Sequence, residues 1–134
     1  MGVARSRVAA LVLLSGAILI GAPAAAHHSY AMFDRTTSVE ISGTVRTVQW
    51  TNPHVYVWVN VDNDEGQTDV WGIEFIGGPN GLVRRGWTKR TLSPGDPITM
   101  ELHPLKDGRT GGMFMNVTLA NGEVWTVEGV QKQE

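Results

Sequence analysis

The stretch HVYVWVNV at residues 54–61 decides the fold, because apolar and polar side chains alternate along it with a period of two. Such alternation predicts a β-strand with one buried face. The predicted buried face is made of valines: Val55, Val57, Val59 and Val61. The opposite face carries Tyr56 and Trp58. This strand is therefore expected to help build the core of an all-β domain.

Segments with the same period follow at regular intervals, separated by turn residues. The predicted strands span residues 40–50, 54–61, 70–76, 98–103 and a closing hairpin of 113–120 and 123–127. Between the third and fourth strands, residues 82–85 are expected to form one helical turn capped by Asn80. This order of elements predicts a small five-stranded OB-like barrel with one short helical connection, with a β-sandwich of similar length as the alternative.

Residues 1–26 have the three parts of a signal peptide: two arginines, an apolar run and then the small residues GAPAAA. The apolar run is too short to cross a bilayer as a helix, so no transmembrane anchor is expected after processing. Cleavage is predicted after Ala24 or Ala26. The predicted product is periplasmic or secreted, with an N-terminal arm at residues 27–39 and a β-barrel domain at residues 40–134.

Composition excludes several classes of site. The chain contains no cysteine, which rules out blue-copper, iron–sulfur and zinc-thiolate centres. Without the two arginines of the signal, 9 basic side chains stand against 13 acidic ones. That balance gives no general attraction to phosphate backbones, so nucleic acid is not expected as a partner.

Four blocks of sequence carry a resemblance to a family: AHHSYAMFD at residues 26–34, GTVRTVQWTNPHVYVWV at 43–59, GWTKRTLSPGDPITM at 86–100 and HPLKDGRTGG at 103–112. Together they resemble an uncharacterised family of short exported bacterial proteins, a domain of unknown function marked by an AHHS mature start and a WTNPH strand. The resemblance covers nearly the whole mature chain. It implies export and a compact β domain, and it implies no catalytic mechanism.

Histidines give the candidate metal ligands. Either predicted cleavage brings His27 and His28 close to a new amino terminus. A terminal amine and an imidazole nitrogen together suit Cu(II), which favours nitrogen ligands in a plane. His54 begins the second predicted strand and His103 ends the fourth, both at the expected rim. We therefore predict an exported binding module that holds copper or a related divalent ion through the processed terminus and a rim histidine, with His54 preferred.

Two other interpretations of the histidines stay open. The terminal pair can be a solvated end that binds copper without help from the fold, and each rim histidine can be a strand-end residue bonded to a turn. The choice between these interpretations depends on which side chains the fold brings together.

Aromatic residues support an alternative function without a metal. Tyr56, Trp58 and Trp50, with Trp125, can form an exposed stacking platform for a carbohydrate or an exported protein partner. They can equally form a second packed layer under the N-terminal arm. The sequence has no Gly-x-Ser-x-Gly elbow, Walker loop or His-Glu-x-x-His motif, so no enzymatic activity is predicted.

Methionines offer a further alternative, a cuprous thioether site at Met100, Met113 and Met115. Their spacing favours core packing instead. Met113 and Met115 fall on the same predicted strand face as Val117, and Met100 alternates with apolar residues of the fourth strand. Met32, in the arm near the terminal histidines, is less constrained.

Overall fold

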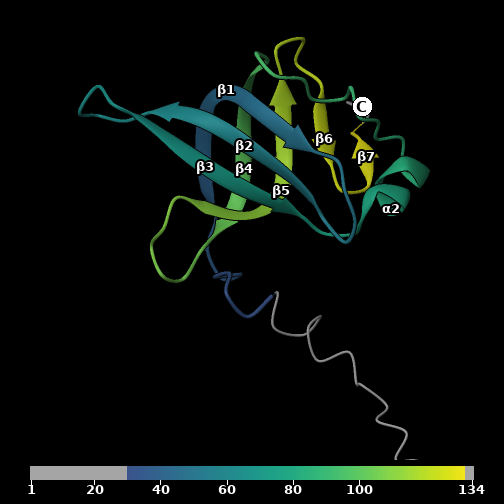
Figure 1. The fold of residues 1–134 in the computed structure, drawn as a ribbon, viewed down its shortest axis with the longest axis horizontal. Helices are drawn as coiled ribbons and strands as arrows, with labels where there is room; N and C mark the ends of the chain where they lie inside the picture. The colour runs from purple at the N-terminus through teal and green to yellow at the C-terminus, as the bar shows by residue number, and fades with distance from the viewer. Residues whose placement is uncertain (1–29, 132–134) are drawn as a thin grey trace, which may run out of the picture.

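The computed structural model describes residues 30–131, and this part folds as one sheet of seven strands with a single short helix. Figure 1 shows the elements in chain order. The strands are β1 (Val39–Gln49), β2 (Val55–Asp62), β3 (Thr68–Phe75), β4 (Pro97–Pro104), β5 (Gly111–Leu119), β6 (Val124–Thr126) and β7 (Gly129–Val130). The helix α2 (Pro79–Arg84) lies between β3 and β4.

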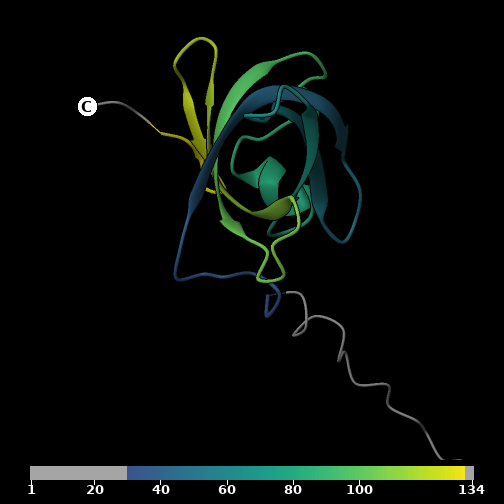
Figure 2. The same ribbon diagram turned by 90° about the vertical axis from the view of Figure 1, so that its left-hand side faces the viewer.

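The first five strands close into a barrel. β1 pairs antiparallel with both β2 and β4, β2 pairs with β3, β4 pairs with β5, and a parallel pairing of β3 with β5 completes the ring. Figure 2 shows the strands encircling the centre, with the yellow C-terminal strands at the side, and Figure 1 shows α2 at one end of the barrel. The order β1-β2-β3-β5-β4 with a helix after β3 is an OB-like barrel, which confirms the predicted fold class.

The predicted valine face forms one wall of the core. Val55, Val57 and Val59 are at most 1% exposed, and Val61 packs partly buried at the edge of the cluster. Across the barrel, Phe75 stacks on Phe114 with ring centroids 3.9 Å apart. The same pattern of alternation therefore directs Tyr56 and Trp58 to the outside of the barrel.

β1 is irregular at one point of its pairing with β2. The register between the two strands shifts between Val45 and Thr47. Nearby, Gly43 lies against β2, since a Cβ there would be 2.1 Å from the carbonyl oxygen of Asn60. Any side chain at residue 43 would therefore collide with the backbone of β2.

A bulge in β5 overturns one prediction about the methionines. Glu101 pairs with Asn116 but Leu102 pairs with Phe114, so the register passes over Met115. The shift turns Met113 to the outer face of the barrel while Phe114 points into the core. Met113 is buried, as packing predicts, but the prediction that it shares the inner face with Val117 is wrong. For Met100, which is fully buried in the core cluster, the prediction is confirmed.

The helix and the C-terminal strands differ in detail from expectation. α2 begins at Pro79 with Gly78 as its N-cap and no side-chain cap, so the predicted cap at Asn80 is wrong. A proline fits the first helical position because its missing N–H has no helical partner there. β7, which pairs with β6, was not predicted because it has only two residues.

The predictions about export concern residues that the structure does not describe. The predicted signal peptide, both cleavage sites and the terminal pair His27 and His28 lie outside the described residues. Between residues 30 and 131, no helix has both the length and the apolar character needed to cross a membrane.

Candidate functional site

Four chemically distinctive side chains lie in one row on the outside of the barrel. Tyr56 of β2 is opposite Glu74 of β3, Glu74 is opposite Met113 of β5, and Met113 is opposite His103 of β4. Residues in register on adjacent strands share a face of the sheet. We call these four residues the outer row, and it crosses the barrel where β3 and β5 close it.

His54 is fixed against this row. It precedes the first residue of β2, and its Nδ1 lies 2.5 Å from Oε1 of Glu74. The imidazole is 26% exposed and the Glu74 side chain 9%. A buried carboxylate needs polar partners to offset its lost hydration, and His54 supplies one. The ring of His54 is thus held in a defined orientation at the barrel rim.

Glu74 also interacts with Tyr56. Burial, followed by the hydrogen bond to Glu74 and its negative charge, raises the pKa of Tyr56 to about 12. The phenol therefore stays protonated at neutral pH and donates to the carboxylate. One buried carboxylate thus links the imidazole of His54 and the hydroxyl of Tyr56.

The loop before His54 is packed against the start of α2. A Cβ at Gly78 would lie 2.8 Å from the carbonyl oxygen of Pro53 and 2.9 Å from Oδ1 of Asn52, so only glycine lets the two loops meet this closely. The Asn52–Pro53 peptide bond is cis. These contacts set the position from which His54 reaches Glu74.

His103 is anchored in a comparable way from the other end of the outer row. Its Nδ1 lies 2.7 Å from the carbonyl oxygen of Thr37. A carbonyl only accepts, so Nδ1 of His103 donates this hydrogen bond and Nε2 takes no part in it. Both rim histidines predicted from the sequence therefore use Nδ1 for an oxygen of the protein.

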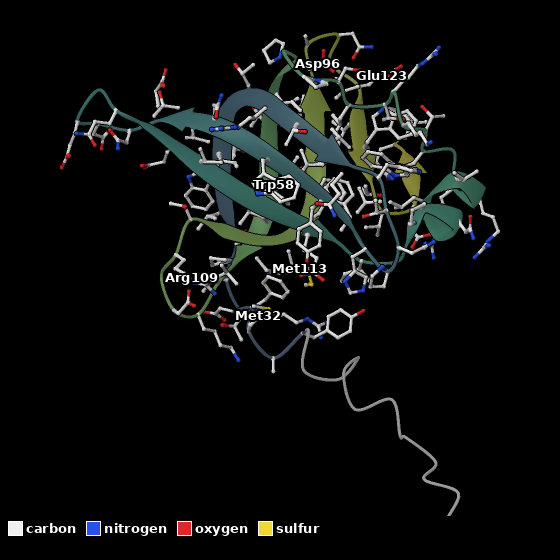
Figure 3. The ribbon with its side chains drawn as sticks, in the orientation of Figure 1. Met32, Trp58, Asp96, Arg109, Met113 and Glu123 are labelled. Carbon is white, nitrogen blue, oxygen red and sulfur yellow. The ribbon has the colours of Figure 1, made fainter. Side chains whose placement is uncertain are left out.

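The segment that precedes β1 runs along the end of β4. Phe33 bridges to Leu105, the amide of Lys106 donates to the carbonyl of Met32, and Phe33 is only 4% exposed. Figure 3 shows Met113 on the side of the barrel that faces this segment and Met32. The described chain therefore begins, at Tyr30, on the face that carries the outer row.

The described residues do not complete a metal site from histidines and acids. Between residues 30 and 131, no group of three or more histidine, cysteine, aspartate or glutamate side chains is close enough to hold an ion together. His54 and Glu74 form a pair, and His103 lies beyond Met113 in the outer row. The predicted ligands His27 and His28 are outside this part of the chain, so their contribution stays a prediction.

The predicted aromatic platform is divided. Tyr56 and Trp58 stack on the outer face with centroids 5.8 Å apart and planes 28° apart. Trp50 packs against the barrel core instead, as does Trp125, which contacts Trp87 edge to face. Only Tyr56 and Trp58 of the three predicted ligand-binding aromatics therefore share a surface.

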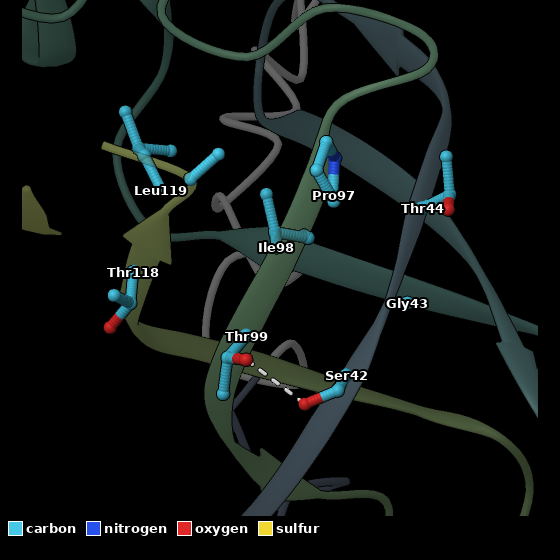
Figure 4. Close-up of a pocket in the computed structure, with 9 residues that line it drawn as sticks. Ser42, Gly43, Thr44, Pro97, Ile98, Thr99, Thr118 and Leu119 are labelled. Atoms are coloured by element: carbon cyan, nitrogen blue, oxygen red, sulfur yellow. Dashed lines mark hydrogen bonds between the residues drawn. The ribbon is translucent and has the colours of Figure 1, made fainter. Parts of the chain in front are cut away.

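Two surface depressions flank other parts of the barrel. One, of about 480 Å³, has mainly hydroxyl and apolar side chains, and Ser42 and Thr99 share a 2.9 Å hydrogen bond in it (Figure 4). Its lining residues are Ser42, Gly43, Thr44, Pro97, Ile98, Thr99, Thr118, Leu119 and Ala120. They include no titratable side chain, so this depression offers no metal ligand of the usual kind. The second, beside Trp58, is lined by Arg46, Thr47, Gln49, Trp58 and Val70.

Sequence reasoning missed two members of the site. Glu74 was not among the predicted ligands, and Met113 was expected to pack in the core. A carboxylate in the middle of an otherwise apolar strand end was the available signal for Glu74, because such a group needs a partner when it is buried. No comparable local signal distinguished Met113 from Met100.

The fold and the site together define a small OB-like β-barrel with an anchored histidine at its rim. The chain belongs to a family of unknown function, DUF6152, whose model matches residues 15–116. This confirms the resemblance to an uncharacterised family.

A comparison with curated proteins gives no significant match. Similar solved structures include two crystal forms of Rim1, the mitochondrial single-stranded DNA binding protein of S. cerevisiae. Form 2 is 12% identical with a TM-score of 0.46, over 63% of this chain and 93% of that one. Form 1 is 13% identical with a TM-score of 0.45, over 63% and 92%.

Proposed function

We propose that this protein is an exported binding module for copper or a related divalent ion. In this proposal the new terminal amine and His27 or His28 supply ligands from the processed terminus, and Nε2 of His54 supplies a ligand from the barrel. The observation that carries the proposal is the contact between Nδ1 of His54 and the buried carboxylate of Glu74.

That contact is typical of a metal-binding histidine. A ligating imidazole usually donates its other ring N–H to a carboxylate or carbonyl, which fixes the ring and increases the basicity of the ligating nitrogen. Glu74 occupies this position for His54, and the hydroxyl of Tyr56 also hydrogen-bonds to this carboxylate. A solvated strand-end histidine would need no buried carboxylate of this kind.

The start of the described chain also supports the proposal. Tyr30 precedes the segment in which Phe33 bridges to Leu105 just after β4. The predicted terminal ligands His28 and His27 come two and three residues before Tyr30 in the sequence.

Competition titration of Cu(II) with the mature protein tests the proposal. We expect His54→Ala, and a form with one extra residue before His27, to bind Cu(II) more weakly. Glu74→Gln should reduce the affinity by roughly 10–100-fold, the usual range for loss of an outer partner of a ligand. The control is Asn60→Ala, six residues further along the outer face of β2. If His54→Ala and His103→Ala both leave the affinity unchanged, the barrel takes no part in binding.

The stacked pair Tyr56 and Trp58 supports a second candidate function, a metal-free module for a carbohydrate or an exported protein partner. Their rings lie on the outer face beside the depression that Arg46 and Gln49 line. Aromatic faces of this kind stack on sugar rings. Isothermal titration with neutral oligosaccharides should show binding that Trp58→Ala abolishes and Asn60→Ala retains. Equal heats for the wild type and Trp58→Ala would exclude this surface.

A further inference from the structure

Met113 is buried in an unusual place. It is 4% exposed, yet it points to the outside of the barrel and does not belong to the cluster of residues that fills the core. An apolar side chain on the outer face of a strand is ordinarily exposed. The cover over Met113 therefore comes from outside the barrel, on the face where the segment with Met32 and Phe33 runs.

The neighbours of Met113 in the outer row are both polar. Glu74 on one side holds Nδ1 of His54, and His103 on the other side gives its own Nδ1 to the carbonyl of Thr37. Each arrangement leaves Nε2 of the imidazole available as a ligand. The thioether of Met113 therefore lies between His103 and the carboxylate that holds His54.

The chemistry of sulfur decides which ion this arrangement suits. Thioethers are soft ligands that select Cu(I), whereas amine and imidazole nitrogens also suit Cu(II). Valine or leucine would cover the surface beside Glu74 and His103 equally well, but neither supplies a donor atom. Met32, 42% exposed on the segment that runs past β4, is a second thioether on the same face.

We infer that the thioether of Met113 is a ligand in the site of His54, so that this site binds copper as Cu(I) as well as Cu(II). The inference rests on the proposed function, because His54 supplies the nitrogen ligand. It adds a residue, an oxidation state and a chemical class of ligand that the Cu(II) proposal does not require. His103 flanks Met113 and is not part of the inferred ligand set.

The two oxidation states separate the roles in one experiment. Cu(I) affinity is measured by competition with a chromophoric chelator under reducing, oxygen-free conditions, and Cu(II) affinity by the titration described above. Met113→Leu should weaken Cu(I) binding by about tenfold or more and change Cu(II) binding by less than about twofold, because leucine keeps the apolar volume but has no donor. The matched control is Met100→Leu in the barrel core, which should change neither affinity.

Unchanged Cu(I) affinity in Met113→Leu overturns the inference. An equal loss of Cu(I) and Cu(II) affinity also overturns it, since that pattern marks a structural effect.

A second measurement does not depend on the folding of Met113→Leu. It is copper X-ray absorption of the Met32→Leu protein loaded with Cu(I). A sulfur neighbour of copper is expected there, and a shell of only nitrogen and oxygen overturns the inference. Failure of the proposed function is distinct, since it shows as unchanged Cu(II) affinity in His54→Ala.

Discussion

Replacing Gly112 with alanine tests the strand packing that creates the outer row. Gly112 of β5 is opposite Pro104 of β4 on one side and Ile73 of β3 on the other. A Cβ at Gly112 would lie 2.2 Å from the carbonyl oxygen of His103 and 2.4 Å from Cδ1 of Leu102. Because the first of these atoms is backbone, β4 itself has to move to accept the methyl group.

Overpacking of this kind typically costs 1–3 kcal/mol, and backbone contacts fall at the upper end, so we expect a loss of about 3 kcal/mol. In a domain of roughly 100 residues this lowers the melting temperature by about 12–24 °C. Gly72→Ala is the matched control in the adjacent strand, where a Cβ would be 3.5 Å from Nε1 of Trp58, an ordinary contact. Its expected effect is within about 1 kcal/mol.

Thermal unfolding followed by circular dichroism, with urea titration as a second measure, compares the two variants. The expected order is wild type and Gly72→Ala close together, with Gly112→Ala far below. If both alanine variants melt at the same temperature, β4 and β5 do not approach at Gly112 as described. The register that brings Met113 next to His103 would then have to be abandoned as well.

Three further outcomes are expected. Val57→Asp, which places a carboxylate at a position 1% exposed, should cost several kcal/mol in urea unfolding, whereas Arg85→Ala removes only an exposed ion pair and should cost little. In the metal-free Tyr30→Phe protein, phenolate absorbance should show Tyr56 titrating with a midpoint near 12, and Glu74→Gln should lower this midpoint. The pKa of Tyr56 is raised from 10.0 to about 12 in the folded protein. The stability that the phenol proton contributes is therefore present below pH 10 and is lost as the pH rises to 12. Mass spectrometry of exported protein should find a chain that starts at residue 25 or 27, and an intact membrane-bound chain would contradict this.

Much of the barrel could be predicted because its strands carry their pattern locally. The alternating valines of β2 predict that one face of this strand is buried. The dipeptide Asn121-Gly122 predicts a tight turn, and the structure has a hairpin between β5 and β6 at this position. There the amide of Gly122 donates to the carbonyl of Leu119, and Gly122 has a φ of 87°. The parallel pairing of β3 with β5 follows from the order of elements once the barrel is recognised.

The candidate site could be predicted only in part. His54 was expected at the rim because it precedes a strand, but its bond to Glu74 depends on the register of β2 against β3 and on the loop that Gly78 admits. Such contacts join residues far apart in sequence. Periodicity states which face a residue occupies and does not state which residue of the next strand is opposite.

The bulge in β5 shows why Met113 could not be placed from the sequence. With a period of two, Met113, Met115 and Val117 share a face, and one extra residue at Met115 reverses the side of everything before it. The core determines this reversal, because Phe114 stacks on Phe75 at 3.9 Å and meets Trp87 edge to face. With Phe114 held inward by these aromatic contacts, Met113 must point outward beside Glu74 and His103. The methionine is therefore delivered to the histidine face by the packing of the core, which is why Met113→Leu can change copper chemistry while leaving the barrel interior intact.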